Sequence, residues 1–241
     1  MKGIILAGGL GSRLRPITHI LNKNLLPIYN KPAIFYSIEL FRDAGIKDLC
    51  IIAEYKYIED FKSLLGTGAD FEVSLHYEND SVLKKGPASA LYHAKGFVGS
   101  DSATVVFADG IYDVNIREEV ASFTNGAQVF LKEVDNPTRF GVYQLDEVGD
   151  VISIEEKPKN PKSNLVFTGL AIYDNKVFDI IRNMPPALDG EYYTTDIDKI
   201  YLKKGELKAS VLNGFWRDMG TFDGLFEASE YWYKKNKNYT D

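Results

Sequence analysis

In the first half of the chain, short apolar runs alternate with segments in which apolar residues recur every three or four positions. The short runs predict buried strands, and the periodic segments predict amphipathic helices whose ends are marked by proline or glycine. The expected strands are at 2–7, 48–53, 71–77 and 103–108, and the expected helices are at 32–44, 57–65 and 87–95. Strands that alternate with helices in this way predict a mostly parallel sheet covered on both faces.

Beyond residue 126 the pattern becomes richer in strands. The expected strands are at 127–134, 140–145, 151–155 and 166–173, and helices return at 176–183, 196–204 and 223–235. Strands joined without intervening helices favour antiparallel pairing. The sequence contains neither an internal repeat nor a low-complexity linker. We therefore expect one α/β domain over residues 1–241, with functional halves at about 1–125 and 126–241.

The charge balance argues against one broad class of partner. Of 241 residues, 28 are Lys or Arg and 34 are Asp or Glu, which gives a formal net charge of −6. A chain with this balance is a poor binder of polyanions, so neither nucleic acid nor an anionic membrane surface is expected as a partner. No apolar stretch reaches the roughly 20 residues that cross a bilayer, and Cys50 is the single cysteine. We expect a cytoplasmic protein.

The segment after the first predicted strand carries the strongest functional signal. Residues 6–16 are Leu-Ala-Gly-Gly-Leu-Gly-Ser-Arg-Leu-Arg-Pro. Glycines there let backbone N–H groups approach a phosphate closely, and Arg13 and Arg15 add positive charge beside it. The dinucleotide fingerprint would need Gly or Ala at Leu14, and the Walker loop would need Gly-Lys-Ser/Thr. Neither a dinucleotide-dependent oxidoreductase nor a P-loop NTPase is therefore expected.

This loop resembles the signature loop of the sugar-1-phosphate nucleotidyltransferases. Further segments resemble motifs of that family in the family's order, at 22–27, 107–110, 139–142, 155–158, 168–174, 190–196 and 215–221. The resemblance extends over almost the whole chain and is strongest to the short glucose-1-phosphate thymidylyltransferases. It implies a Rossmann-like three-layer sandwich with a mostly parallel, mixed central sheet of the nucleotide-diphospho-sugar transferase type, and an antiparallel elaboration in the second half.

The resemblance also implies a reaction. An oxygen of a sugar 1-phosphate attacks the α-phosphorus of a nucleoside triphosphate, and an NDP-sugar and pyrophosphate result. The simplest pair of substrates is glucose 1-phosphate and dTTP, and the product would serve polysaccharide biosynthesis. Because the attacking oxygen is already an anion, alignment and charge neutralisation must supply the catalysis. A homo-oligomer, either a dimer or a tetramer, is left open.

The family's motifs imply roles for individual residues. The expected catalytic residues are Arg13 on the leaving phosphates, Lys23 between the reacting phosphates, and Asp109. Mg²⁺, which prefers one or two carboxylates with waters and substrate oxygens, is expected on Asp109 and Asp218. Residues 192–193 are expected to pack rather than to bind substrate. The expected nucleotide-binding residues are Leu6, Ala7, Gly8, Gly9, Gly11, Ser12, Arg13, Asn79 and Gly86, and the expected acceptor-binding residues are Gly141, Glu156, Lys157, Thr168, Gly169 and Trp216.

Two departures from the family pattern leave alternatives open. The relatives carry a base-reading Gln where residues 77–90 contain none, and Asn79 is the candidate replacement. The relatives also carry an Arg on the sugar phosphate where this chain has Asp189, whose charge would repel a phosphate. CTP or UTP, or a different phosphorylated or phosphonylated acceptor, is therefore an alternative.

A second alternative is a catalytically silent homologue that binds nucleotide sugars as a regulatory subunit. The residues whose joint presence argues against it are Arg13, Lys23, Asp109, Lys157 and Asp218.

Overall fold

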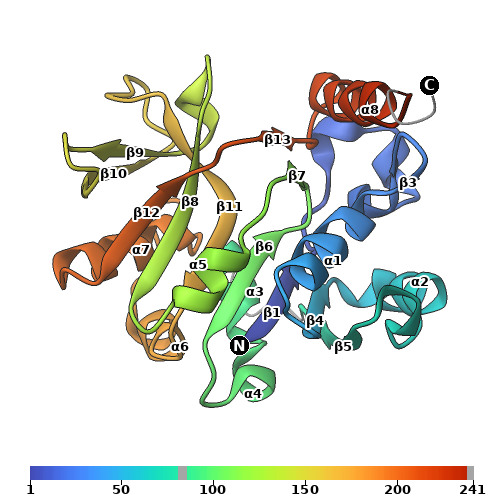
Figure 1. Cartoon of the computed structure of the whole chain (residues 1–241), viewed down its shortest axis with the longest axis horizontal. Helices are drawn as coiled ribbons and strands as arrows, with labels where there is room; N and C mark the ends of the chain where they lie inside the picture. Colours follow the sequence, from blue (N-terminus) through green and yellow to red (C-terminus); the bar gives the residue numbers. More distant parts are fainter. Residues whose placement is uncertain (81–85, 238–241) are drawn as a thin grey trace.

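The computed structural model describes residues 1–80 and 86–237. In this part of the chain, nine strands form one sheet in the order β10-β9-β11-β6-β1-β4-β5, with β8 paired to β11 and β12 paired to β8. Figure 1 shows this sheet running through the middle of the molecule with helices packed around it. The arrangement confirms the predicted α/β class with a mixed central sheet.

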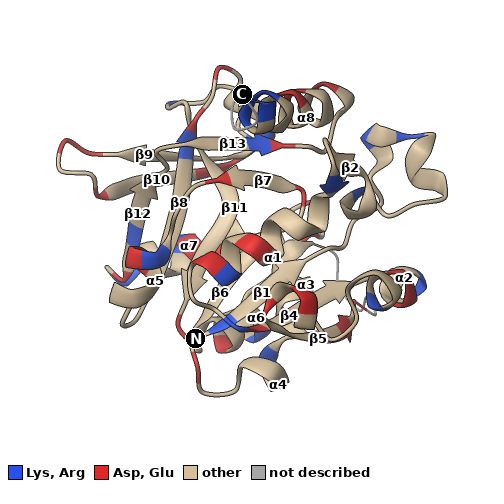
Figure 2. Cartoon of the chain, turned by 45° about the vertical axis from the view of Figure 1, so that its right-hand side comes forward, with Lys and Arg blue, Asp and Glu red and all other residues tan. Residues whose placement is uncertain are grey.

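The first half contributes the parallel part of the sheet. Its strands are β1 (Lys2–Leu6), β4 (Asp48–Ala53), β5 (Ser74–Asn79) and β6 (Ala103–Phe107). Strand β1 is parallel to β4 on one side and to β6 on the other, and β4 is parallel to β5. The strands β1, β4 and β6 carry charge only at their first residues, if at all, and Figure 2 shows charged residues mainly on helices, loops and strand ends. Their apolar runs therefore lie in the core, as predicted.

One predicted strand begins later than expected. The alternating pattern at 71–77 predicts a strand, but β5 begins only at Ser74. The preceding residues Ala69–Phe71 form a 3-10 turn, and Glu72 has a left-handed φ of 58°, which lies outside the extended region of a regular strand. The strand then continues to Asn79, so its carboxyl end lies closer to the glycine loop than the prediction placed it.

Helices of the first half cover both faces of the parallel strands. They are α1 (Ala33–Asp43), α2 (Tyr55–Leu65), α3 (Pro87–Tyr92), α4 (Lys95–Val98) and α5 (Arg117–Ser122). The expected helix at 87–95 is divided between α3 and α4, and α5 was not predicted. Alternate residues of β1 enter the two layers of the core, with Ile4 and Leu6 on one face and Ile5 on the other.

The second half adds the antiparallel part. Its strands are β8 (Ala127–Glu133), β9 (Gly141–Leu145), β10 (Val151–Glu156), β11 (Leu165–Tyr173) and β12 (Leu207–Val211). Strand β11 is antiparallel to β6, β8 and β9, and it thereby connects the two halves. The helices are α6 (Val177–Asn183) and α7 (Thr194–Lys203). Strand β12, which is parallel to β8, was not predicted.

A separate two-stranded ladder crosses above the main sheet. It consists of β7 (Gly110–Asp113) and β13 (Phe215–Asp218), which run antiparallel. Helix α8 (Phe222–Lys237) packs beside it, with the Tyr231 ring stacked on Phe215 at 3.8 Å. Figure 1 shows β13 reaching from the second half across to α8, which lies above the first half near the small ladder of β2 (Pro27–Ile28) and β3 (Lys31–Pro32). None of these four short strands was predicted.

Within residues 1–80 and 86–237, no helix combines the length and the apolar character that crossing a bilayer requires.

Candidate active site

The glycine loop that follows β1 is shaped by its neighbours. Gly9 and Gly11 adopt left-handed backbone angles, with φ of 93° and 57°, which other residues rarely tolerate. A Cβ atom at Gly11 would lie 2.9 Å from Cγ2 of Thr18, and the Thr18 hydroxyl donates a 2.7 Å hydrogen bond to the Gly11 carbonyl oxygen. The loop therefore requires glycine for its turn as well as for close approach to a ligand.

Two asparagines fix the lysine that follows the loop. The side-chain amides of Asn22 and Asn24 both donate to the carbonyl oxygen of Ala7 at 3.1 Å, and both residues are buried. Lys23 lies between them, and its Nζ atom is 2.5 Å from Oδ2 of Asp109. The sequence motif indicates Lys23, whereas only the structure shows that the asparagines anchor it to the end of β1.

Asp109 and Asp218 come together although they are far apart in the sequence. Asp109 lies two residues after the end of β6, and Asp218 is the last residue of β13, where it pairs with Gly110 in the β7–β13 ladder. The backbone N–H of Met219 donates to the carbonyl oxygen of Asp109 at 2.9 Å. The ladder thus brings the two predicted metal ligands to one place.

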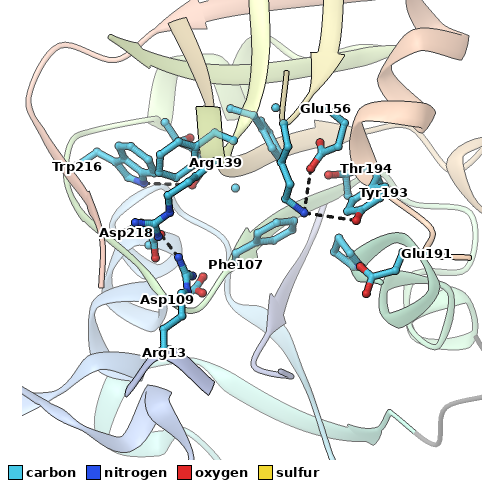
Figure 3. Close-up of a pocket in the computed structure, with 18 residues that line it drawn as sticks. Arg13, Phe107, Asp109, Arg139, Glu156, Glu191, Tyr193, Thr194, Trp216 and Asp218 are labelled. Atoms are coloured by element: carbon cyan, nitrogen blue, oxygen red, sulfur yellow. Dashed lines mark hydrogen bonds and ion pairs between the residues drawn. The ribbon is translucent and has the colours of Figure 1, made fainter. Parts of the chain in front are cut away.

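Positive side chains surround these two acids. Oδ2 of Asp218 lies 3.4 Å from Nη2 of Arg139 and 3.7 Å from Nη2 of Arg13, and Figure 3 shows both arginines directed toward it. Burial and then the charge of Asp109 raise the pKa of Asp218. Burial acts in the same direction on Asp109, but the charge and hydrogen bond of Lys23 outweigh it and hold the pKa of Asp109 below its usual value. Asp109 is therefore the better anion of the two.

Two cavities meet at Asp109. The larger, the loop cavity, has a volume of about 960 Å³ and lies between the glycine loop and the end of β5. The smaller, the sheet cavity, has a volume of about 230 Å³ and lies against the start of β9, the end of β10 and the middle of β11. The described residues that line both are Pro87, Phe107, Asp109 and Glu191. Ligands in the two cavities would consequently meet at the Asp109 carboxylate.

The sheet cavity holds a glutamate whose two oxygens are both engaged. Oε2 of Glu156 accepts a 2.8 Å hydrogen bond from the Thr195 hydroxyl, and Oε1 lies 3.3 Å from Nζ of Lys157. Lys157 has a left-handed φ of 43°, and its Nζ atom lies 4.4 Å from the centre of the Tyr193 ring. A strained non-glycine backbone beside a cavity is typical of functional sites. Figure 3 shows Glu156 and Tyr193 on the same side of this cavity.

A bulged stretch of β11 forms another wall of the sheet cavity. The β8–β11 register shifts between Phe167 and Ala171, which marks a β-bulge or a similar irregularity. Bulges are common next to active sites. The Thr168 carbonyl oxygen accepts hydrogen bonds from Tyr112 Oη at 2.7 Å and from Trp216 Nε1 at 3.1 Å. These contacts tie the bulge to the β7–β13 ladder.

The predicted site residues divide between the two cavities. All the predicted acceptor-binding residues line the sheet cavity: Gly141, Glu156, Lys157, Thr168, Gly169 and Trp216. The predicted nucleotide-binding residues that line the loop cavity are Leu6, Gly8, Gly9, Asn79 and Gly86. Arg13 lines the sheet cavity instead, and Ala7, Gly11 and Ser12 are not among the described lining residues of either cavity.

Sequence reasoning missed several lining residues. Arg139 and Glu191 lie in segments that resemble family motifs, but residue type and spacing gave them no role. Tyr193, which was expected to pack, lines the sheet cavity, whereas Tyr192 is in the core as expected. Asp80 lines the loop cavity, and burial raises the pKa of its carboxyl. In the sequence, Asp80 could have been recognised as a candidate from its position just after a predicted strand of the parallel sheet that contains the glycine loop.

The acids at the junction fit a hard divalent cation. In the described part of the chain, no group of three or more His, Cys, Asp or Glu side chains is placed to hold a metal. Mg²⁺ takes one or two carboxylates and completes its shell with waters and substrate oxygens. Asp109 and Asp218 supply such a pair, and the charge of Asp109 raises the pKa of Asp218, a repulsion that a cation between them would relieve.

The sequence matches a known family over nearly its full length. The family model described as "Nucleotidyl transferase" matches residues 2–235. A glucose-1-phosphate thymidylyltransferase from Neisseria meningitidis serogroup A is 40% identical over 237 residues, which cover 96% of this chain and 82% of that relative. One from Mycolicibacterium smegmatis is 39% identical over 236 residues, with the same two coverages.

Solved structures show the same likeness. A crystal structure from Bacillus anthracis, described as a glucose-1-phosphate thymidylyltransferase in complex with a sucrose, has a TM-score of 0.91 and 42% identity, and covers 96% of this chain and 94% of that chain. A UDP-glucose pyrophosphorylase complexed with UDP-glucose has a TM-score of 0.85 at 24% identity, and covers 97% of this chain and 98% of that chain. The second likeness is one of fold alone.

Proposed function

The chain belongs to the nucleotidyl transferase family, and we propose that it joins a nucleoside triphosphate to a sugar 1-phosphate, giving an NDP-sugar and pyrophosphate. The observation that carries this proposal is the meeting of the two cavities at Asp109. A transfer between two bound phosphates requires two sites that open onto one charged centre. We assign the nucleotide to the loop cavity and the sugar phosphate to the sheet cavity. The division of the chain into an NTP-binding half at about 1–125 and a sugar-phosphate-binding half at about 126–241 stays a prediction.

Lys23, Arg13 and Arg139 would neutralise the reacting phosphates. Lys23 reaches the junction from the loop cavity, and the two arginines reach it from the sheet cavity. A planar guanidinium can bind two phosphate oxygens at once, and an ammonium acts as a point charge between them. With the attacking oxygen already anionic, these cations lower the barrier by offsetting repulsion and by stabilising the leaving pyrophosphate.

We assign Mg²⁺ to Asp109 and Asp218. Bound there, it would supply charge neutralisation on phosphate oxygens at the junction. The chain's own part is to keep both carboxylates in place: the Gly220 N–H donates to Oδ1 of Asp218 at 2.7 Å, and Lys23 holds Asp109. A side chain at Gly220 would meet Asp218 Oδ1 at 2.8 Å, so glycine is needed for this approach.

Glucose 1-phosphate is the first acceptor to test. Lys157 lies at the edge of the sheet cavity, where it would bind the sugar phosphate, and Glu156 would accept hydrogen bonds from sugar hydroxyls. Asp189 lies close by, since its Oδ2 accepts a 2.7 Å hydrogen bond from Tyr193 Oη, which is 3.4 Å from Lys157 Nζ. Its negative charge motivates the alternative of a different phosphorylated or phosphonylated acceptor.

We propose dTTP as the first nucleotide to test. Strand β5 ends with Asn79 at the loop cavity, and Asp80 follows it. Asn79 Oδ1 is buried without a hydrogen-bond partner among the described residues. A buried acceptor in that state is suited to a base N–H donor, such as N3–H of thymine or uracil. UTP offers the same donor and CTP offers an N4–H donor, so both stay alternatives. The remaining part of the predicted base loop, residues 81–85, lies outside the described residues.

The test is a grid of activities. Pyrophosphate release is measured for dTTP, UTP, CTP and GTP against glucose 1-phosphate and other sugar 1-phosphates, with and without Mg²⁺, and products are identified by mass. We expect release in at least one cell of the grid, and none without a divalent cation. Release in no cell, with tight binding of NDP-sugars, would instead support the silent regulatory homologue.

The cellular setting follows from the substrates. NTPs and sugar phosphates are intracellular metabolites, so we propose that the enzyme acts in the cytoplasm. Assembly into a dimer or tetramer stays a prediction that sedimentation of the purified chain would test.

A further inference from the structure

Helix α7 is fastened to the sheet by polar contacts on one of its faces. Thr195, Asp198 and Tyr201 are spaced three residues apart, so their side chains lie on one side of the helix. Thr195 donates to Glu156, Asp198 accepts from two tyrosines, and Tyr201 Oη donates to Asp174 Oδ1 at 2.7 Å. Polar contacts have replaced apolar packing at every third position along this face.

The middle contact is a carboxylate with no exposed surface. Asp198 is 0% exposed. Its Oδ2 accepts from Tyr143 Oη at 2.5 Å, and its Oδ1 accepts from Tyr173 Oη at 2.8 Å. Ion pairs in the described part of the chain include none with Asp198, so two phenols alone satisfy the group. Burial raises the pKa of Asp198 to about 7. Keeping this carboxylate ionised in the core therefore costs the folded chain free energy.

The residues that Thr195 and Asp198 contact are also neighbours in the sheet. Tyr143 follows Gly141 by two positions on β9, so both face the same side of the sheet. Gly141 pairs with Glu156 on β10. The helix spacing from Thr195 to Asp198 therefore matches the strand spacing from Gly141 to Tyr143, and α7 and β9 meet at two successive points.

The first of these points has almost no room to shift. A Cβ atom at Gly141 would lie 2.4 Å from Cγ2 of Thr195 and 3.2 Å from Oε2 of Glu156. The helix thus approaches the strand closely enough that only glycine fits between them. A small rotation of α7 would move the Thr195 hydroxyl away from Glu156 and leave that carboxylate free to turn out of the sheet cavity.

We propose that Asp198 is a positioning residue for the acceptor site: its two tyrosine contacts fix the rotation of α7, and Thr195 in turn holds the Glu156 carboxylate toward the sugar. The inference rests on the assignment of the acceptor to the sheet cavity. Asp198 itself touches no substrate, since it lines neither cavity in the described residues. It acts on binding of the acceptor and leaves the phosphate chemistry at Asp109 unchanged.

The experiment compares Asp198→Leu, which removes the contact, with Asp198→Asn, which can still hydrogen-bond both tyrosines. We expect Asp198→Leu to raise the KM for the sugar phosphate about tenfold, because the loss of one hydrogen bond between Glu156 and the sugar corresponds to roughly that factor. The KM for the NTP and kcat should stay within about twofold, and Asp198→Asn should restore the acceptor KM. Phe61→Leu, at a buried core residue of α2 that is not among the described lining residues of either cavity, is the control for destabilisation alone.

A double-mutant cycle gives the sharper test. Thr195→Val removes the hydroxyl that holds Glu156, so combining it with Asp198→Leu should raise the acceptor KM no further than Thr195→Val does alone. Additive effects would overturn the proposal, as would an Asp198→Leu chain with a wild-type acceptor KM, or one whose two KM values and kcat change together in the same way as those measured for Phe61→Leu. Should Asp198→Leu not fold, the pair Tyr143→Phe and Tyr173→Phe removes the same contacts and is held to the same expectations.

A structural readout separates this proposal from the proposed function. In a crystal structure of Asp198→Leu, we expect the 2.8 Å contact between Thr195 and Glu156 to be lost. A wild-type chain that turns over no sugar phosphate would contradict the proposed function, whereas an unchanged Thr195–Glu156 contact in the variant would contradict the positioning role.

Discussion

Nζ of Lys23 lies 2.5 Å from Oδ2 of Asp109, at the place where the loop cavity and the sheet cavity meet. The pair joins the segment after the glycine loop to the end of β6, and both side chains are largely shielded from solvent. Without substrate, the lysine neutralises the carboxylate. With phosphates present, the same ammonium has a second set of anionic partners within reach, and the acid is available to a cation.

Replacement of Lys23 should therefore impair the reaction more than binding. We expect Lys23→Ala to lower kcat by about 100- to 1000-fold, the usual effect of removing one preorganised charge contact in a transition state, with a smaller change in either KM. Steady-state kinetics on both substrates checks this. Lys56→Ala, at another lysine of the loop cavity, is the control, and an equal loss of kcat there would contradict a specific role for Lys23.

Asp218→Asn should separate stability from activity. Burial and the neighbouring Asp109 charge disfavour the ionised Asp218 side chain, so a neutral amide should raise the melting temperature when no divalent cation is added. The same change removes one proposed metal ligand, and we expect kcat to fall at least 100-fold with a higher Mg²⁺ requirement. Thermal melts and Mg²⁺ titrations of activity test the two effects, and a variant with normal Mg²⁺ dependence would remove Asp218 from the metal site.

Gly169→Ala should destabilise the fold through both backbone and packing. Gly169 has a φ of 86°, and a Cβ atom there would lie 2.9 Å from Cβ of Phe107. We expect a loss of about 1–3 kcal/mol in the free energy of unfolding, measured by urea denaturation. Gly149 has a φ of 93° but open space around it, so Gly149→Ala isolates the backbone part and should cost less. Equal losses would show that Phe107 adjusts without penalty.

The carboxyl of Asp198 should make stability depend on pH. Burial raises its pKa from 3.8 to about 7, while the hydrogen bonds of Tyr143 and Tyr173 lower it, and the charges of Glu156 and Asp196 raise it further. Between these two pKa values the folded chain binds a proton that the unfolded chain has released, so the free energy of unfolding falls as pH rises from about 4 to about 7 and levels off above.

The matched variant for this effect is Asp198→Asn, which cannot titrate. Relative to it, the wild type should lose on the order of 4 kcal/mol at most between pH 4 and pH 8. Urea denaturation of both chains at several pH values gives the difference directly. A difference that does not change with pH would mean that Asp198 keeps an ordinary pKa in the folded state.

The local pattern of apolar and polar residues was sufficient to predict the strands that are buried along almost their whole length. Strands β1, β4 and β6 were predicted because their apolar runs record burial directly. Strands β7 and β13 were missed, since each has only four residues of mixed character and gains its stability from partners far along the chain: the other strand, β11 and α8. Family-like motifs indicated Asp109 and Asp218, but no sequence signal gave the ladder that joins them.

Asp198 shows the same limit for a single side chain. A charged residue on an amphipathic helix is expected on the solvent face, and Asp196 and Asp198 look alike in sequence. The partners that allow Asp198 to be buried are tyrosines on β9 and β11. Burial of such a group is decided by contacts far along the chain, which helical periodicity does not contain.

The β7–β13 ladder has a consequence for how the protein is made. Because Asp218 reaches Asp109 only when β13 pairs with β7, a ribosome must release most of the polypeptide before the proposed metal site can form. A prematurely terminated product that stops before Phe215 would keep the glycine loop and yet lack one of the paired acids. Such an incomplete product would lack one of the two proposed Mg²⁺ ligands, and we expect it to have no transferase activity.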